Sequence, residues 1–387
     1  MPRILTPCLF FALVSAVSAC PFCSQQGKSF TAEATQLTTD LVLYGKVKSA
    51  DEKTDTSEIV VEQWIKDDKR RGKADVIRVQ KYLDPTILDD KHRILLFCEW
   101  VNDKIDAYRG VVVKQGSSLP TYLAEAIKTQ GKPAVERLKF FFRYLDDADP
   151  EVAMDAYREF ANCDYKDFAA LAKELPPERI IKWLKSPDTQ PFRIGLYASM
   201  LGHCGKPEHS AVLKELLADP DRRGAGSGVD GLLAAQVLLN KTEGWKALLA
   251  ALRDTKEDFN YRFAALRAVR FFHDYRPEVI PLKDRVEAVC LLLTQDDIAD
   301  LAIEDLRKWK QWKVADRVLA LTKTPAYKEV NVIRRAILRY CLQCKGHEAA
   351  AAYVAARRKE DPEAVADAEE LLKIEAESPK PLKEENE

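Results

Sequence analysis

Amphipathic helical segments recur along most of this chain of 387 residues, and this recurrence is the feature that most limits its possible folds. Their starting points are 33 to 40 residues apart. Self-similarity at such a period is typical of helix pairs that stack on one another and share a continuous core. The sequence therefore predicts an α-solenoid over residues 132–375. The recurring segments begin near Asp155, Gly195, Gly231, Ala264, Leu301 and Arg335.

Further amphipathic segments lie between the recurring ones. Several turns contain an acidic residue and a proline, which cap or start helices, as in Asp149-Pro150, Pro187-Asp188 and Asp219-Pro220. This pattern resembles HEAT-type repeats over residues 132–375, which implies a solenoid of HEAT-like helical repeats. A polar helix over Glu363–Glu375 is suited to close the array. Residues 376–387 are charged, contain two prolines and have almost nothing to bury, so we expect a disordered tail.

The chain before the repeats has a different texture. Runs rich in β-branched and aromatic residues alternate with charged turns, as in short strands. A helix over Thr121–Lys128 follows the last run. Five short strands and a helix predict a small barrel over residues 20–131, and hence an α+β multidomain chain. The expected strands are Leu41–Val47, Glu58–Trp64, Val76–Val79, Arg93–Cys98 and Tyr108–Val113.

The region that opens with Cys20 and Cys23 and continues through Leu41–Val47 to a cysteine-bearing strand at Cys98 resembles the netrin-like module. That module is an OB-type barrel shared with tissue inhibitors of metalloproteinases. In the inhibitors one residue separates the first two cysteines, and both have partners in the barrel. Here Pro21 and Phe22 separate them, and Cys98 is the one other cysteine of the region. The resemblance implies a disulfide from Cys23 or Cys20 to Cys98.

The amino terminus has the features of an export signal. Arg3 precedes a short apolar segment, Ile4–Val17, and small residues come just before Cys20. The segment is shorter than the about 20 apolar residues that a membrane span needs. The sequence thus predicts a signal peptide over residues 1–19 and an extracytoplasmic, periplasmic or cell-envelope location.

The chemical state of Cys20 has several alternatives. Val17-Ser18-Ala19-Cys20 approximates a bacterial lipobox, with valine in place of the usual leucine, so acylation of Cys20 would anchor the chain to a membrane. Otherwise Cys20 could be bridged, act with Cys23 as a thiol redox pair, or chelate zinc through its free amine. A redox site of this kind needs a preceding strand, which a mature amino terminus lacks.

The overall charge excludes some partners. The formal net charge is −1, and 47% of the residues are hydrophobic, so the chain supports substantial cores but has no bulk field for nucleic acid. No spacing of histidines predicts a metal site, and no motif predicts catalytic residues or a cofactor. The glycines Gly226, Gly228 and Gly231 spell a dinucleotide fingerprint, but a helix precedes them where a strand is needed, so we interpret them as an interhelix loop.

Basic residues gather on the later recurring helices. If these helices line an inner surface, the side chains would form a strip for a protein or acidic polymer partner. The alternative is that they belong to ordinary helix faces, balanced by Asp258, Asp274, Glu304 and Asp305. The predicted basic strip consists of Arg262, Arg267, Arg270, Arg307, Lys308, Lys310, Arg334, Arg335 and Arg339.

These observations favour a non-enzymatic scaffold or adaptor that binds through its helical repeats. The resemblance to the netrin-like module implies a second function, inhibition of an extracytoplasmic protease by chelation through Cys20. A thiol oxidoreductase that uses Cys20 and Cys23 is the third.

Overall fold

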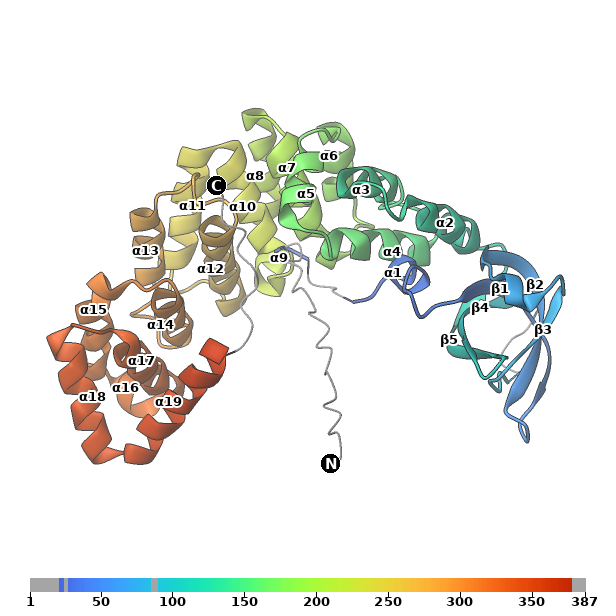
Figure 1. Ribbon diagram of the computed structural model, residues 1–387. Coiled ribbons are helices and arrows are strands. Elements are labelled where there is room, and N and C mark those ends of the chain that lie inside the picture. The colour runs from blue at the N-terminus through green and yellow to red at the C-terminus, as the bar shows by residue number, and fades with distance from the viewer. Residues whose placement is uncertain (1–20, 24–26, 85–89, 378–387) are drawn as a thin grey trace, which may run out of the picture. The chain divides into compact units, whose positions relative to one another are not determined.

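The structure, a computed structural model, describes residues 21–23, 27–84 and 90–377 (Figure 1). The chain divides into two compact units. The amino-terminal unit is Phe22–Gly205, and the carboxy-terminal unit is Lys206–Glu387 with Pro21 from the beginning of the chain. The predicted signal peptide, Cys20 and all but the first two residues of the predicted tail lie outside the described residues.

The amino-terminal unit contains a five-stranded sheet and the first helices, so the α+β class is confirmed (Figure 1). The strand order is β1-β2-β3-β5-β4, and the sheet closes because β4 also pairs with β1. All neighbours are antiparallel except β3 and β5, which pair in parallel through Val79 and Ile105. All five predicted strands are present. Their bounds are β1 Leu41–Asp51, β2 Thr56–Lys66, β3 Val76–Val79, β4 His92–Val101 and β5 Lys104–Lys114.

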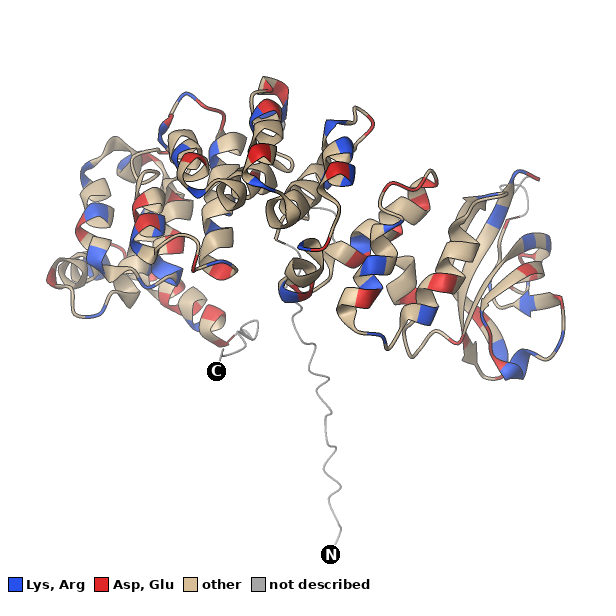
Figure 2. Cartoon of the chain, turned by 90° about the horizontal axis from the view of Figure 1, so that it is seen from above, with Lys and Arg blue, Asp and Glu red and all other residues tan. Residues whose placement is uncertain are grey.

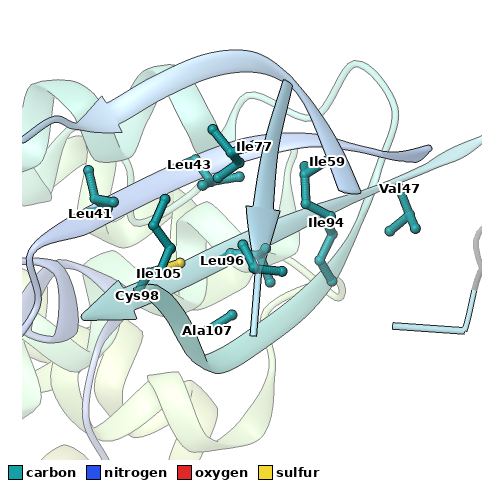
Figure 3. Packing of buried hydrophobic residues seen from close by; sticks show 11 residues of the cluster. Leu41, Leu43, Val47, Ile59, Ile77, Ile94, Leu96, Cys98, Ile105 and Ala107 are labelled. Carbon is teal, nitrogen blue, oxygen red and sulfur yellow. The ribbon is translucent and has the colours of Figure 1, made fainter. Parts of the chain in front are cut away.

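Alternate strand residues fill the interior of the closed sheet, as the inward side chains of Figure 3 show. Strand residues point to opposite faces in turn, so one face of each strand lines the interior. The other face of β1 and β4 is also buried in part, at Val42, Leu95 and Phe97. Cys98 is part of this core and is completely buried. The core consists of Leu41, Leu43, Val47, Ile59, Ile77, Val79, Ile94, Leu96, Cys98, Ile105 and Ala107.

Gly45 allows β1 and β2 to approach closely where the sheet curves. The register between the two strands shifts between Tyr44 and Gly45. A Cβ atom on Gly45 would lie 2.3 Å from the carbonyl oxygen of Val60. Any side chain here would force the strands apart, so the position requires glycine.

Helices follow and precede the sheet in the amino-terminal unit. Proline and aspartate start α4, where Asp149 caps the helix by accepting from the backbone N–H of Glu151. The helices are α1 Phe30–Ala34, α2 Leu119–Ala126, α3 Ala134–Phe142, α4 Pro150–Ala161, α5 Tyr165–Ala172, α6 Pro177–Lys185 and α7 Ile194–Cys204, with short 3₁₀ turns η1 Lys69–Arg71, η3 Ile127–Thr129 and η4 Pro191–Arg193.

Asp155 on α4 joins three helices through one carboxylate. It accepts hydrogen bonds from the backbone N–H groups of Phe30 and Thr31, the latter at 3.3 Å, and from the Thr31 hydroxyl at 2.6 Å. The Tyr122 hydroxyl of α2 donates to the same carboxylate at 3.0 Å. The residue is only 1% exposed. One turn along α4, Glu159 accepts from Ser29 and pairs with Arg137 of α3 at 3.1 Å.

Lys66 of β2 holds the other end of α1. Its ammonium donates to the carbonyl oxygens of Ala34, Gln36 and Thr39 at 3.0, 3.2 and 2.5 Å. Burial lowers the pKa of Lys66, because the charged form loses solvation. The short helix α1 is therefore fastened to α4 at its start and to the sheet at its end.

The carboxy-terminal unit consists of helices. Helix α10 packs on α11 and α12, α14 packs on α17, and α17 packs on α18 and α19. The glycines Gly226 and Gly228 have φ of 68° and 76° and join α9 to α10, which confirms an interhelix loop. The elements are η5 Pro207–His209, α8 Ser210–Leu217, α9 Pro220–Ala225, α10 Val229–Leu239, α11 Lys241–Arg253, α12 Phe259–Asp274, α13 Leu282–Cys290, α14 Ala299–Lys308, η6 Trp312–Val314, α15 Ala315–Ala320, η7 Leu321–Lys323, α16 Pro325–Glu329, α17 Asn331–Gln343, α18 Glu348–Glu360 and α19 Pro362–Glu377.

We predict that Asp155→Ala lowers the free energy of unfolding of the amino-terminal unit by about 3 to 5 kcal/mol, because it leaves several buried donors without their acceptor. Urea unfolding of the full chain, followed by hydrogen exchange of α1 and α4, measures the loss. The exposed Asp188→Ala is the matched control and should change the free energy by less than about 0.5 kcal/mol. Equal stability of the two variants would contradict the role of Asp155.

Candidate functional site

The predicted basic strip lies within the carboxy-terminal unit, on α12, α14, the turn after α14 and α17. Acidic residues are interspersed with basic ones along the helices of the chain (Figure 2). The free charge of the strip therefore depends on which basic residues are paired.

The arginines of α12 bind carboxylates from other helices and loops. Arg262 is 5% exposed and donates to Asp297 at 2.5 and 2.9 Å. Arg270 donates to Asp305 of α14 at 2.8 and 3.0 Å. Arg267 lies 2.7 Å from Asp230 of α10. The three arginines thus form the ion pairs Arg262–Asp297, Arg267–Asp230 and Arg270–Asp305.

Two arginines and two glutamates bind one another at the end of the helical array. Arg307 of α14 is 3% exposed and lies 2.8 Å from both Glu304 and Glu375. Arg339 of α17 lies 3.0 Å from Glu304 and 2.7 Å from Glu375 of α19. A cluster of alternating charges of this kind connects α14, α17 and α19.

The predicted strip is thus largely neutralised inside the fold. Arg262, Arg267, Arg270, Arg307 and Arg339 are all in ion pairs, and Arg334 donates to the carbonyl oxygens of Tyr327 and Lys328. The exposed remainder of the strip consists of Lys308, Lys310 and Arg335.

The ion pairs link helices in succession. Asp230 joins α10 to α12, Arg270 joins α12 to α14, and Glu304 and Glu375 join α14, α17 and α19. The paired residues are 35 to 37 positions apart in these links, a separation equal to the recurrence in the sequence. We call this set the ion-pair ladder. Its members are Asp230, Arg267, Arg270, Asp305, Glu304, Arg339 and Glu375.

Burial dominates the electrostatics of two ladder carboxylates. It raises the pKa of Asp230 to about 6, although Arg267 lowers it, and raises the pKa of Asp305 to about 6, although Arg270 lowers it. At Glu375 burial also raises the pKa, but hydrogen bonds and charges from Arg307 and Arg339 outweigh it, and the result is a lowered pKa. Mild acid therefore protonates Asp230 and Asp305 and removes the charge from their pairs with Arg267 and Arg270.

Sequence reasoning missed the partners of the arginines. Glu304 and Asp305 were named as balancing charges, but Asp230, Asp297 and Glu375 were not. The available signal was the separation: an acidic residue lies 35 to 37 positions from each of Arg262, Arg267 and Arg339. In an array of repeats, such residues face each other across adjacent helices.

The cysteine predictions centre on Cys20, Cys23 and Cys98. Cys98 is a free thiol in the core of the sheet, so the predicted disulfide to Cys98 is not present. The strand β4 places this side chain on the apolar interior face, where it packs as a small hydrophobic residue. Cys23 is buried, and the acylation, chelation and redox predictions for Cys20 lie outside the described residues.

Two searches within the described part of the chain found nothing. No group of three or more histidine, cysteine or acidic side chains there could hold a metal ion. None of the helices described is long and apolar enough to cross a membrane.

The chain was compared with protein families, curated proteins and solved structures, and none of them matches it.

We predict that the stability of the chain relative to its Asp230→Asn variant falls as the pH rises from 4 to 7. The pKa of Asp230 is about 6 in the folded chain and near 3.8 when unfolded. Between these values the folded state binds more protons, so the free energy of unfolding decreases with rising pH. The expected decrease is about 2 to 3 kcal/mol.

Urea unfolding of the full chain at several pH values, with the loss of helical circular dichroism as the signal, measures this difference. The exposed Asp296→Asn is the control and should show no such dependence. A difference between wild type and Asp230→Asn that stays constant, or grows, with pH would refute the assignment.

We also predict that Cys98 resists alkylation in the folded chain. Its side chain is inaccessible, and burial raises the pKa of the thiol, which removes the reactive thiolate. Peptide mapping after treatment with N-ethylmaleimide should find Cys98 unmodified in buffer and modified in denaturant without a reductant. A disulfide-linked peptide that contains Cys98 would contradict the free thiol.

Proposed function

We propose that the chain is an exported, non-enzymatic scaffold of the cell envelope, built from an OB-type barrel and a HEAT-like solenoid. The closed strand order β1-β2-β3-β5-β4 with a parallel β3–β5 pair supports the barrel. The regular separation of the bonded residues supports the repeats.

The observation that carries the proposal is the ion-pair ladder. Charged residues that could have served a catalytic site or a charged surface bind neighbouring helices instead. Breaking the Arg267–Asp230 or the Arg270–Asp305 pair leaves a buried carboxylate without its partner, so these pairs favour a single arrangement of the helices. A fixed array of helices is suited to hold a partner in place.

A similar separation recurs in the amino-terminal unit, between α6 and the turn that follows α3. Arg179 of α6 donates to Asp146 at 2.6 Å and Trp183 donates to the same carboxylate at 2.8 Å, across 33 and 37 positions. In the proposed solenoid, these bonds fasten the early repeats as the ladder fastens the later ones. Both sets join residues about one repeat apart.

A protein or acidic polymer partner would meet the part of the strip that stays exposed. Lys308 and Lys310 lie at the end of α14 and Arg335 lies on α17, which packs against α14. Val332, one turn from Arg335 on α17, is 52% exposed and adds an apolar contact. An apolar residue rimmed by cations is suited to a protein surface with acidic groups.

The test is quantitative capture of partners from an envelope extract by the immobilised mature chain. The variant Lys308→Glu/Lys310→Glu/Arg335→Glu should reduce capture of a specific partner about tenfold, because it opposes an acidic surface with like charge. The variant Lys246→Glu/Lys283→Glu/Lys323→Glu makes the same change of net charge on other exposed positions and should keep capture. Equal capture by all three proteins would overturn this binding surface.

A further inference from the structure

A cleft of about 590 Å³ lies on the closed sheet of the amino-terminal unit, over β3 and its neighbours. Cavities of about 300 to 1,000 Å³ are typical of sites for small ligands. The β1–β2 turn, the start of β5 and the loop that contains η1 all contribute to its walls. This cleft is separate from the surface proposed above for the helices.

Two arginines of the η1 turn form one wall and are already engaged. Arg70 donates to Asp68 at 2.8 and 2.9 Å and to Asp40 at 2.6 Å. Arg71 donates to Asp67 at 2.6 and 2.8 Å. These carboxylates neutralise both guanidinium groups. The two arginines therefore define the shape of the wall and add little positive charge to the cleft.

The same two arginines stack on tryptophans. The guanidinium of Arg70 lies 5.2 Å from the centre of the Trp100 ring, and that of Arg71 lies 4.1 Å from the centre of the Trp64 ring. Such cation–π contacts, together with the ion pairs, fix the position of the wall.

Arg78 and Lys104 are cations of the cleft lining that form no ion pair with another described residue. The parallel pair Val79–Ile105 has both side chains inside the sheet. The preceding residues, Arg78 and Lys104, therefore lie side by side on the outer face, and both are exposed. Neither one is in an ion pair with another residue that the structure describes, although Arg78 interacts electrostatically with the carboxylate of Asp51.

Hydroxyl groups orient Arg78, and nearby acidic side chains do not form an ion pair with it. Its guanidinium donates to the Thr56 hydroxyl at 2.9 Å and lies 3.5 Å from the Thr54 hydroxyl. Glu58 is opposite Arg78 on β2 but binds Lys48 and Ser49 instead. Like charges on neighbouring strands repel each other, so an anion between Arg78 and Lys104 would relieve the repulsion.

Trp100 of β4 also lines the cleft. It is opposite Ile105 on β5, so its ring lies on the inner face of the sheet, where it packs against the apolar core. Its indole Nε1–H is buried and has no hydrogen-bond partner among the residues described, so this N–H reports on the cleft without itself binding a ligand.

We propose that this cleft binds a small ligand that carries a phosphate or sulfate ester. Two adjacent cations match the charge of such a group, and a guanidinium fork beside hydroxyl donors matches its oxygens. The cleft is much larger than a single oxyanion, so the remainder of the ligand occupies the space along β3. Asp103, also in the lining, disfavours a second anionic group nearby.

The experiment is an NMR titration of the full chain, observed at the indole N–H of Trp100, which Trp100→Phe identifies. The probes are glucose 6-phosphate and glucosamine 6-sulfate, and glucose is the neutral control. We expect a saturable shift with at least one charged probe and none with glucose. Saturation with one charged probe alone assigns the site to that ester.

The variant Arg78→Gln/Lys104→Gln should weaken binding at least tenfold, because each lost charge-assisted hydrogen bond is worth about 1.5 kcal/mol or more. Lys114→Gln/Lys128→Gln makes the same change of net charge at exposed positions outside the lining and should bind as the wild type does. Absence of any saturable shift up to about 10 mM probe, where a Kd of 1 mM would be nearly saturated, overturns the proposal. Equal affinity of the two variants overturns it as well.

Discussion

The amino-terminal unit depends on the carboxylate of Asp155. This side chain lies on the first turns of α4, yet its donors come from the segment before the sheet and from the helix after the sheet. The carboxylate is completely surrounded by protein, where solvation is lost and hydrogen bonds are strong. Burial raises its pKa, so the bonds to it offset a real cost of desolvation. Through this group the segment before the sheet and the helix after it are both joined to α4.

The carboxy-terminal unit solves a related problem with a series of ion pairs. Apolar faces alone permit helices to slide along one another, because hydrophobic contact has no direction. An arginine and a carboxylate 35 to 37 positions apart form an ion pair only in one register of their helices. The pairs therefore define the register at the cost of burying charge, and the raised pKa values of Asp230 and Asp305 report that cost.

Local patterns were sufficient to predict the five strands and part of the helices. The β-branched runs from Leu41 to Val113 became five strands, and the Asp-Pro turns at Asp149 and Asp219 start α4 and α9, because strand preference and capping depend on a few adjacent residues. The candidate site could not be predicted in this way. Whether Arg270 faces solvent or Asp305 depends on which helices become neighbours, and the bonds of Asp155 span 33 to 125 positions.

Cysteine chemistry shows the same limit. A cysteine on a strand of a chain that is expected to be exported suggests a bridge. The run Ile94–Cys98 is apolar throughout, so the sequence of β4 does not show on which face Cys98 lies. The completed fold decides between a bridge and a buried free thiol, because the interior position gives the sulfur apolar neighbours from several strands.

The closure of the sheet has a consequence for its mechanics. Strands β1, β2 and β4 share long ladders, whereas β3 meets β5 through the single pair Val79–Ile105 and the bond from the Gln80 N–H to the Ile105 carbonyl at 2.7 Å. A closed ring of strands opens first where the fewest hydrogen bonds must break. The seam between β3 and β5 is therefore the place where this ring yields most easily under thermal motion or force. A ligand that joined Arg78 to Lys104 across this seam would hold the closed sheet together where its strands share the fewest hydrogen bonds.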